Sequence, residues 1–326
     1  SKELGLLEMK PKGSCALIVV NLGTPDAPDE ESIRRFLKQF LSDPRVVDFP
    51  RWLWLPILNR IILKNRPKRL VEDYSFIWGG KAGPILEITL SLTRKLQRML
   101  PPEIKVITAM TYGNPSIKDA MEEARHFDRI IVLPMFPQYA GATTGAIEDQ
   151  INASKVELSL EKPLQIIKEY HNEPSYIKAI SSTIANPTRF SETDSKLVFS
   201  FHGIPQSQSK RGDPYQNQCK KTATLIAEKL GLKPEEWMLT FQSRFGPLPW
   251  LKPYTDKTMQ KLPKLGIRDV TLICPGFSAD CLETIQEIDV ENREFFLGAG
   301  GNSFTYIKAL NDTDDHVEML KTIVLK

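Results

Sequence analysis

The sequence predicts an α/β protein that contains two copies of one structural unit. Short apolar runs rich in β-branched residues alternate with longer runs of helical periodicity, and this alternation is typical of parallel sheets covered by helices. Two of the apolar runs recur later in the chain, and a length of 326 residues is enough for about two domains. We therefore expect two α/β domains, each large enough to bury its own core.

Six apolar runs are expected to form strands, and the segments between them to form helices. The expected strands are Cys15–Asn21, Ile104–Tyr112, Arg129–Pro134, Leu197–His202, Met238–Gln242 and Asp269–Cys274. The expected helices are Ser32–Leu41, Leu86–Leu100, Ser116–Arg125, Glu173–Ala185, Asn217–Leu230 and Thr255–Lys261.

The internal repeat sets the expected domain organisation. Leu17–Pro25 reads LIVVNLGTP, and Leu197–Pro205, 180 residues later, reads LVFSFHGIP. Arg129–Phe136 resembles Asp269–Phe277 in the same way, but the matching prolines and phenylalanines are 141 residues apart. The difference of 39 residues indicates an insertion in the first copy, at about 44–83. We expect a first domain of residues 14–172 together with 305–326, and a second of residues 173–304.

The expected insertion is unusually apolar between Trp52 and Leu63, and it is followed by the basic residues Lys64, Arg66, Lys68 and Arg69. One interpretation is a helix packed on its own domain, because large exposed apolar patches are uncommon on monomers. Another is a flap over an apolar ligand. The same segment could rest on an anionic membrane surface without crossing it, or pair with a second copy in a homodimer.

Composition excludes several classes of protein. Lys and Arg number 43 against 40 Asp and Glu, a net charge of +3, and the basic residues are scattered, so nucleic acid is not an expected partner. The four cysteines show no Cys-x-x-Cys spacing and fit a reducing cytoplasm. Ser1–Ser14 lacks the apolar core of a secretory signal, and no apolar run approaches ~18 residues. We expect a cytoplasmic protein that either stays free or lies at the inner face of the membrane.

Three glutamates, Glu283, Glu287 and Glu291, are spaced four residues apart after a predicted strand. On a helix they share one face, at the carboxyl end of a strand, where α/β proteins bind ligands. Such a row could hold a cation or pass protons stepwise toward water. The alternative is a solvated helix face on which Asp280 is the N-cap and Glu283 completes a capping box.

His202 supplies a second candidate group. It ends an apolar strand, at the position that the repeat makes equivalent to Leu22. A single histidine at such a place is more often a core residue than a ligand. Here, however, the end of its strand and the turn from Asp280 to Glu283 are expected at the same edge of one sheet. This convergence favours a functional site.

The chain resembles the ferrochelatases over nearly its whole length. The motifs that carry the resemblance are Asn21–Pro25 (NLGTP), Met110–Pro115 (MTYGNP), Pro137–Tyr139 (PQY), Thr143–Gly145 (TTG), Ser200–Pro205 (SFHGIP), Arg211–Tyr215 (RGDPY), Phe241–Leu251 (FQSRFGPLPWL) and Cys274–Glu291. The resemblance implies two Rossmann-like domains around a porphyrin cleft, with insertion of Fe(II) into protoporphyrin IX as the closing step of haem synthesis.

The resemblance also implies roles for particular residues. His202 and Glu283 are expected to contact the metal and accept protons, with His202 as the base and Glu283 as a relay. Glu287 would extend that path, and Asp280 would support it from the turn. The residues expected to bind the porphyrin are Leu22, Tyr112, Trp250 and Phe277 as packing groups and Arg66 as a partner of the propionates.

One departure from the family pattern is the turn Gly79–Pro84, in which Gly83 stands where the family has a serine. No cofactor is expected, because Fe(II) is a substrate, and no iron–sulfur cluster, because the C-terminal cysteines that hold it in some relatives are absent. Two alternatives stay open: a chelatase that prefers coproporphyrin, and a carrier of porphyrin or haem that does no chemistry. A dinucleotide-binding oxidoreductase is disfavoured, because no Gly-x-Gly-x-x-Gly follows the first strand.

Overall fold

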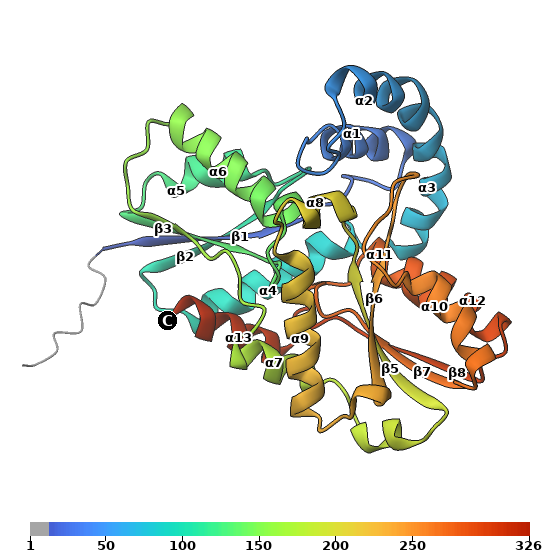
Figure 1. The fold of residues 1–326 in the computed structure, drawn as a ribbon. Helices are drawn as coiled ribbons and strands as arrows, with labels where there is room; N and C mark the ends of the chain where they lie inside the picture. Colours follow the sequence, from blue (N-terminus) through green and yellow to red (C-terminus); the bar gives the residue numbers. More distant parts are fainter. Residues whose placement is uncertain (1–12) are drawn as a thin grey trace, which may run out of the picture.

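The computed structural model of the protein describes residues 13–326. The prediction made for Ser1–Ser14 therefore falls almost entirely outside the described residues. Figure 1 shows two parallel sheets in separate halves of the molecule, with helices around each. The strands are β1 (Cys15–Asn21), β2 (Ile104–Met110), β3 (Arg129–Pro134), β4 (Leu164–Ile166), β5 (Ser195–His202), β6 (Trp237–Gln242), β7 (Asp269–Ile273) and β8 (Ser303–Ile307).

The two sheets have the same topology. The strand order is β2-β1-β3-β4 in the first and β6-β5-β7-β8 in the second, and all pairs are parallel. Leu17 of β1 pairs with strands on both sides, as does Leu197 of β5. The chain thus reverses its direction of winding at β1 and again at β5. Ligand clefts form at such switch points, beyond the carboxyl ends of the strands. The shared topology confirms the α/β class and the repeat.

Helices cover both faces of each sheet. They are α1 (Glu30–Leu41), α2 (Arg51–Ile57), α3 (Leu63–Ile77), α4 (Pro84–Met99), α5 (Ile117–Ala124), α6 (Ala146–Glu157), α7 (Pro174–Ser181), α8 (Gln206–Lys210), α9 (Tyr215–Lys229), α10 (Thr255–Lys261), α11 (Leu282–Ile285), α12 (Arg293–Gly298) and α13 (Asp314–Val324). Three π-helical segments are η1 (Leu58–Ile62), η2 (Gly141–Gly145) and η6 (Glu287–Asn292), and three 3₁₀ turns are η3 (Pro187–Ser191), η4 (Pro234–Glu236) and η5 (Leu262–Leu265).

Successive side chains of the central strand β1 point into two different parts of the apolar core. In β1, Leu17 and Val19 point to one face and Ile18 and Val20 to the other, as the two-residue period of a strand requires. The first face joins residues of β5, α4, α7, α9 and α13 in one apolar cluster between the sheets. The opposite face packs against α5 and α6. Because both sheets contribute to the central cluster, the two halves are held at one relative position.

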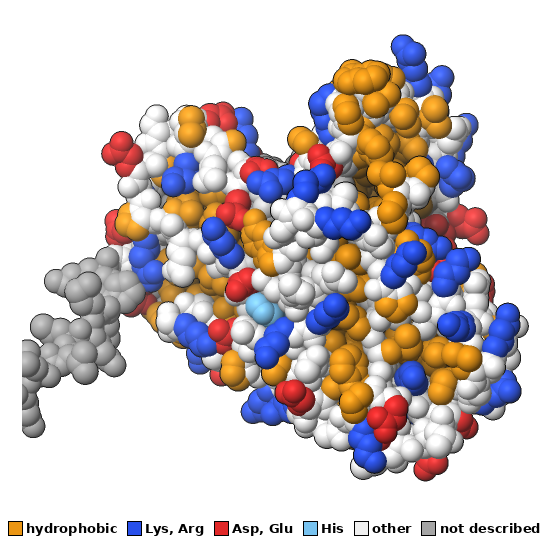
Figure 2. All heavy atoms as spheres, viewed as in Figure 1, with side chains coloured by type: hydrophobic (Ala, Val, Ile, Leu, Met, Phe, Trp, Pro, Cys, Tyr) orange, Lys and Arg blue, Asp and Glu red, His pale blue; other side chains and the backbone are white. Residues whose placement is uncertain are grey.

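The expected insertion forms a helical projection, here called the lip, which consists of α2, η1 and α3. One of its faces packs on α1: Trp54 and Leu58 are buried, and the indole Nε1 of Trp54 donates to the Leu41 carbonyl at 2.6 Å. The other face is open. Trp52 is 75% exposed and Ile61 54%, and Figure 2 shows the resulting apolar patch over α2. The prediction that this segment packs on its own domain is thus confirmed for one face only.

Two edge strands, β4 and β8, were not predicted. β4 has only three residues, and β8 alternates polar with apolar residues as edge strands do. β8 also corrects a domain boundary: it pairs with β7 along its whole length, so the chain leaves the second sheet after Ile307 and not at residue 305. Within residues 13–326, no helix has the length and apolarity that crossing a bilayer requires.

Candidate active site

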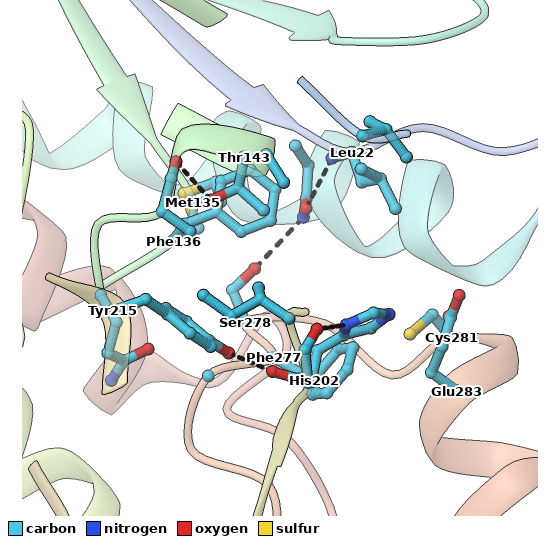
Figure 3. A pocket seen from close by; sticks show the side chains of 18 of the residues that line it. Leu22, Met135, Phe136, Thr143, His202, Tyr215, Phe277, Ser278, Cys281 and Glu283 are labelled. Carbon is cyan, nitrogen blue, oxygen red and sulfur yellow. Dashed lines mark hydrogen bonds between the residues drawn. The ribbon is translucent and has the colours of Figure 1, made fainter. Parts of the chain in front are cut away.

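An open cavity of about 990 Å³ lies between the carboxyl ends of the two sheets. Leu22 follows β1 and His202 ends β5, while Phe136 follows β3 and Phe277 follows β7. These two pairs are equivalent in the repeat. Figure 3 shows Leu22 and Phe136 on one wall, with His202 and Phe277 on the opposite wall. Each copy of the unit therefore contributes one wall of the cavity.

Polar contacts at the base of the cavity hold these walls together. Asn21, at the end of β1, donates from Nδ2 to the Ser278 hydroxyl of the other half at 3.2 Å. The Tyr215 hydroxyl donates to the backbone carbonyl of His202 at 2.7 Å, which fixes the end of β5. Most other lining groups are apolar. An apolar cleft with a few convergent polar groups is the usual form of a small-molecule site.

His202 presents one ring nitrogen to this cavity. Its Nδ1 lies 2.7 Å from the carbonyl oxygen of Gly203, which can only accept, so Nδ1 carries the proton in the neutral ring. Nε2 is then the basic nitrogen. The ring centroids of Trp250 and Phe277 lie 6.4 and 6.5 Å from that of His202. In Figure 3 the imidazole extends toward the side of the cavity where Cys281 and Glu283 lie.

A second cavity, of about 1270 Å³, continues from the first beneath the lip. Leu22, Cys281 and Glu283 line both cavities, so the two are continuous at Glu283. Glu287 and Glu291 line the second cavity opposite Arg66 and other residues of α3. The structure thus brings together His202 and the predicted row of glutamates along one continuous space.

The sequence suggested that the row of glutamates lies on a single α-helix. In the structure it spans two helical segments of different kinds. It begins on α11 and continues on the π-helical segment η6, where the Glu291 N–H donates to the Gln286 carbonyl at 3.0 Å, five residues back. The Asn292 side chain donates to the Glu287 carbonyl at 2.8 Å and so satisfies a group in the wider turn. The four-residue spacing keeps the carboxylates on one side of the helical segment. The wider turn of the π-helix sets the distance between those of Glu287 and Glu291.

The carboxyl group of Glu287 is largely buried and accepts two hydrogen bonds. Burial raises its pKa to about 7, although hydrogen bonds from Ser243 and Gln242 oppose this rise by stabilising the carboxylate. The Ser243 hydroxyl donates to Oε2 at 2.5 Å, and Gln242 Nε2 donates to the same oxygen at 2.9 Å. Burial, followed by the charge of Asp73, also raises the pKa of Glu291. A carboxyl group that titrates near pH 7 can take up and release protons under physiological conditions.

Comparison with known proteins decides the family. The family model described as Ferrochelatase matches residues 14–326. A protein named Ferrochelatase from Hydrogenovibrio crunogenus is 46% identical over 320 residues, which cover 95% of this chain and 85% of that protein. A Ferrochelatase from Psychrobacter arcticus is 45% identical, covering 94% of this chain and 93% of its own. The chain belongs to the ferrochelatase family.

Solved structures support the fold alone. The structure of SirB from Bacillus subtilis with Fe³⁺ matches with a TM-score of 0.58 at 10% identity, covering 96% of this chain and 94% of that one. The cobalt complex of the sirohydrochlorin chelatase SirB from Bacillus subtilis subspecies spizizenii matches with a TM-score of 0.54 at 10% identity, covering 94% and 92%. The two-sheet, chelatase-type architecture of this ferrochelatase is thus shared with distant proteins.

Asp280 lies in the turn before Glu283, as expected, but it does not cap the helix that follows. Cys281, and not Asp280, is the N-cap of α11. The Asp280 carboxylate is buried and accepts hydrogen bonds from the Tyr306 hydroxyl at 2.6 Å, from Asn311 Nδ2 at 2.8 Å and from the Thr284 hydroxyl at 2.9 Å. It lines none of the cavities described above. Asp280 therefore ties the turn before Glu283 to the C-terminal segment, and its part in catalysis stays a prediction.

Tyr112, expected to pack against the porphyrin, does not line either of the two cavities. It is 2% exposed, and its hydroxyl donates to Asp43 at 2.6 Å. Its ring packs edge-on against Phe40, with centroids 5.1 Å apart, and it is Phe40 that lines both cavities. Tyr112 therefore supports the wall from behind and does not form its surface.

The other predicted binding residues reach the cavities. Leu22, Trp250 and Phe277 line the first cavity. Arg66 lines the second, where its guanidinium lies 4.9 Å from the centre of the Phe245 ring and burial lowers its pKa. Sequence reasoning missed Phe136, although its equivalence to Phe277 in the repeat was a sufficient signal. It also missed Ser243, whose contact with Glu287 no sequence pattern indicates.

Proposed function

We propose that this ferrochelatase inserts Fe(II) into protoporphyrin IX to form protohaem, with His202 and Glu283 acting on the same macrocycle. The observation that carries the proposal is that both groups line one apolar cavity, between walls that the two repeats supply. Metal insertion replaces two pyrrole N–H protons by one Fe(II) ion. The site therefore needs a base, a way out for protons and ligands that release the ion readily.

His202 and Glu283 are proposed to share these tasks. Nε2 of His202 is the base, because Nδ1 is bound to the Gly203 carbonyl and that carbonyl also stabilises the ring once it is charged. Imidazole and carboxylate together suit a borderline ion such as Fe(II). Among residues 13–326, no three His, Cys, Asp or Glu side chains are grouped so that they could hold a metal ion. A pair of ligands fits an ion that must move on into the porphyrin.

The released protons are proposed to leave through Glu283 and Glu287. Glu283 lines both cavities, and Glu287 follows it in the second. Because the pKa of Glu287 is raised to about 7, this carboxyl group can accept a proton from Glu283 and pass it on toward Glu291. Leu22 and Trp250 are proposed to hold the macrocycle between them, and Arg66 to bind a propionate.

The substrate is proposed to be protoporphyrin IX and not coproporphyrin, because the walls of the first cavity are mainly apolar and four carboxylates would find few partners there. The test is an anaerobic assay in which porphyrin fluorescence is followed as Fe(II) is added to either porphyrin. We expect faster loss of fluorescence with protoporphyrin IX, together with the absorbance of protohaem. Faster turnover of coproporphyrin would favour the other chelatase. Tight binding of protoporphyrin without turnover would indicate a carrier. The absence of an iron–sulfur cluster or other cofactor stays a prediction.

The lip is proposed to rest on the cytoplasmic face of the membrane. Its exposed apolar patch is bordered by Arg60 and Lys64, which are exposed and would face anionic lipid headgroups. Co-sedimentation with anionic vesicles should weaken in Trp52→Ser. It should not change in Val156→Ser, which removes an equally exposed apolar side chain from α6. Self-association through the lip without vesicle binding would instead support a homodimer.

A further inference from the structure

The row of glutamates opens to the surface through a third cavity, of about 600 Å³. This cavity and the second one share Ser243, Arg244, Glu287 and Glu291 as lining residues, so the two adjoin at this point. The third cavity is also lined by Asp256. Its charged groups are thus three carboxylates and one guanidinium, that of Arg244, and the cavity forms a passage between Glu287 and the outside.

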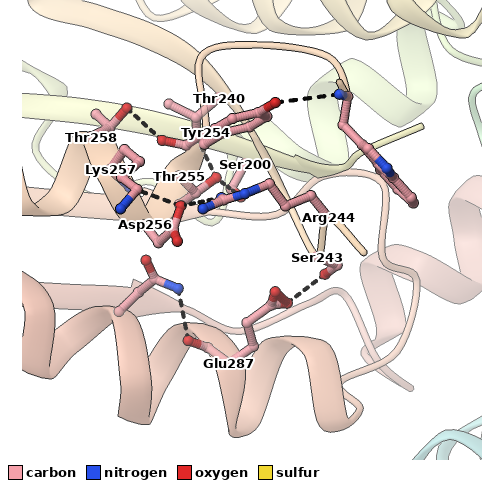
Figure 4. A network of polar contacts seen from close by, with 12 residues as sticks. Ser200, Thr240, Ser243, Arg244, Tyr254, Thr255, Asp256, Lys257, Thr258 and Glu287 are labelled. Carbon is pink, nitrogen blue, oxygen red and sulfur yellow. Dashed lines mark hydrogen bonds and ion pairs between the residues drawn. The ribbon is translucent and has the colours of Figure 1, made fainter. Parts of the chain in front are cut away.

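Arg244 is held to one side of this passage. Its Nη1 donates to Asp256 Oδ1 at 2.6 Å, and its guanidinium carbon lies 4.2 Å from the centre of the Tyr254 ring. Figure 4 shows Arg244 beside Asp256 and Tyr254, while the Glu287 carboxylate is turned toward Ser243. No ion pair is formed between Arg244 and any glutamate among the described residues.

Asp256 is itself fixed in its charged form. It lies in the first turn of α10, where the backbone N–H of Lys257 donates to Oδ1 at 2.9 Å. Burial raises the pKa of Asp256, but the hydrogen bonds from Arg244 and Lys257 outweigh burial, so the pKa lies below its ordinary value. Asp256 thus remains an anion over the physiological range and can balance the charge of Arg244 throughout.

From this geometry we propose that Asp256 is a positioning residue for metal insertion. By binding Arg244 against Tyr254, it keeps a positive charge away from Glu287 and Glu291 and leaves the path to Glu283 acidic. The inference rests on the proposed function, because it concerns the passage of Fe(II) and protons to and from that site.

The proposal predicts that loss of Asp256 raises KM for Fe(II), whereas loss of Arg244 does not. In Asp256→Asn, Arg244 loses its anionic partner. We expect its guanidinium to pair instead with Glu287 and Glu291, the carboxylates that remain in the lining of the same cavity. An arginine placed on them would repel a divalent ion, and at an effective dielectric constant of about 40 and about 10 Å this raises KM for Fe(II) roughly tenfold. In Arg244→Gln, the cation is removed and KM for Fe(II) should stay the same or fall.

The test measures KM for Fe(II) and for protoporphyrin IX separately, in anaerobic assays of purified full-length protein. We expect Asp256→Asn to raise only the value for Fe(II), Asp256→Glu to resemble the unaltered protein, and the double variant Asp256→Asn with Arg244→Gln to return to within about threefold of it. The increase should shrink at high salt. Glu157→Gln, which breaks an exposed ion pair between Glu157 of α6 and Lys118 of α5, is the matched control.

Losses of similar size in both single variants, without recovery in the double variant, would show that the pair only holds the loop and would overturn the proposal. An unchanged KM for Fe(II) in a folded Asp256→Asn protein would overturn it as well. Failure of the unaltered protein to insert iron would be a different result, because it would refute the proposed function and this inference with it. Circular dichroism of each variant establishes that the comparison is made on folded protein.

Discussion

The buried carboxyl group of Glu287 should make the stability of the protein depend on pH in a direction opposite to that of most carboxylates. Burial raises the pKa of Glu287 from 4.5 to about 7 in the folded protein. Between these two values the folded protein binds a proton that the unfolded chain releases. The free energy of unfolding therefore falls as the pH rises from about 4.5 to 7, and changes no further from this cause above pH 7.

The magnitude follows from the difference in pKa. At about 1.36 kcal/mol per unit, a rise from 4.5 to about 7 corresponds to an upper limit of about 3 kcal/mol. Because the side chain keeps some contact with water, we expect about 1–3 kcal/mol. Glu287→Gln retains an oxygen that can accept from Ser243 and Gln242 but cannot ionise. The variant should therefore be more stable than the unaltered protein at pH 8 and close to it at pH 5.

Urea unfolding at both pH values, followed by circular dichroism, measures this difference. Glu157→Gln is the control for the loss of an exposed carboxylate and should show no comparable gain at pH 8. A Glu287→Gln variant that is less stable than the unaltered protein at pH 8, or that gains equally at pH 5, would refute the view that burial holds this group near neutrality.

Three other perturbations have defined outcomes. Ser243→Ala removes a hydrogen bond to the ionised carboxylate, worth about 1.5–3 kcal/mol, and should shift the pH at which iron insertion becomes half-maximal upward by about one unit or more. Burial lowers the pKa of His316 to about 4, so unfolding free energy should fall by up to about 3 kcal/mol from pH 6.5 to 4, and His316→Asn should abolish that part in urea titrations. Gly301→Ala would bring a methyl group within 2.3 Å of the Phe296 ring and should cost about 1–3 kcal/mol in thermal unfolding, whereas Gly298→Ala meets nothing within 4 Å and should not destabilise.

The fold and the placement of the main groups followed from the sequence because repetition carries three-dimensional information. Two segments of equal pattern form strands at equivalent places in equal sheets, so Leu22 and His202 had to lie at corresponding strand ends. The same reasoning places Phe136 opposite Phe277. This reasoning uses only the order of the strand ends in the repeat. An error of one or two residues in the limits of a strand therefore does not change its result.

The sequence pattern does not show in which direction a side chain points or which distant residue binds it. A four-residue spacing fits an α-helix and a π-helix equally, so the geometry of Glu287 and Glu291 could not be predicted. Asp280 is bound by Tyr306 and Asn311, which are distant in sequence and carry no recognisable motif. Tyr112 could not be placed behind Phe40 without knowing how α1 packs on the first sheet. Tertiary contacts decided each of these cases.

The pairing of His202 and Glu283 over one porphyrin is the central claim, and replacement of the base tests it most directly. His202→Ala and the unaltered protein should be compared for protoporphyrin IX binding by fluorescence and for anaerobic Fe(II) insertion by the absorbance of protohaem. We predict that the variant binds the porphyrin with an affinity within about threefold of the parent, because Leu22, Trp250 and Phe277 remain, and that insertion falls by at least about a hundredfold. Insertion at an unchanged rate in His202→Ala would contradict the account.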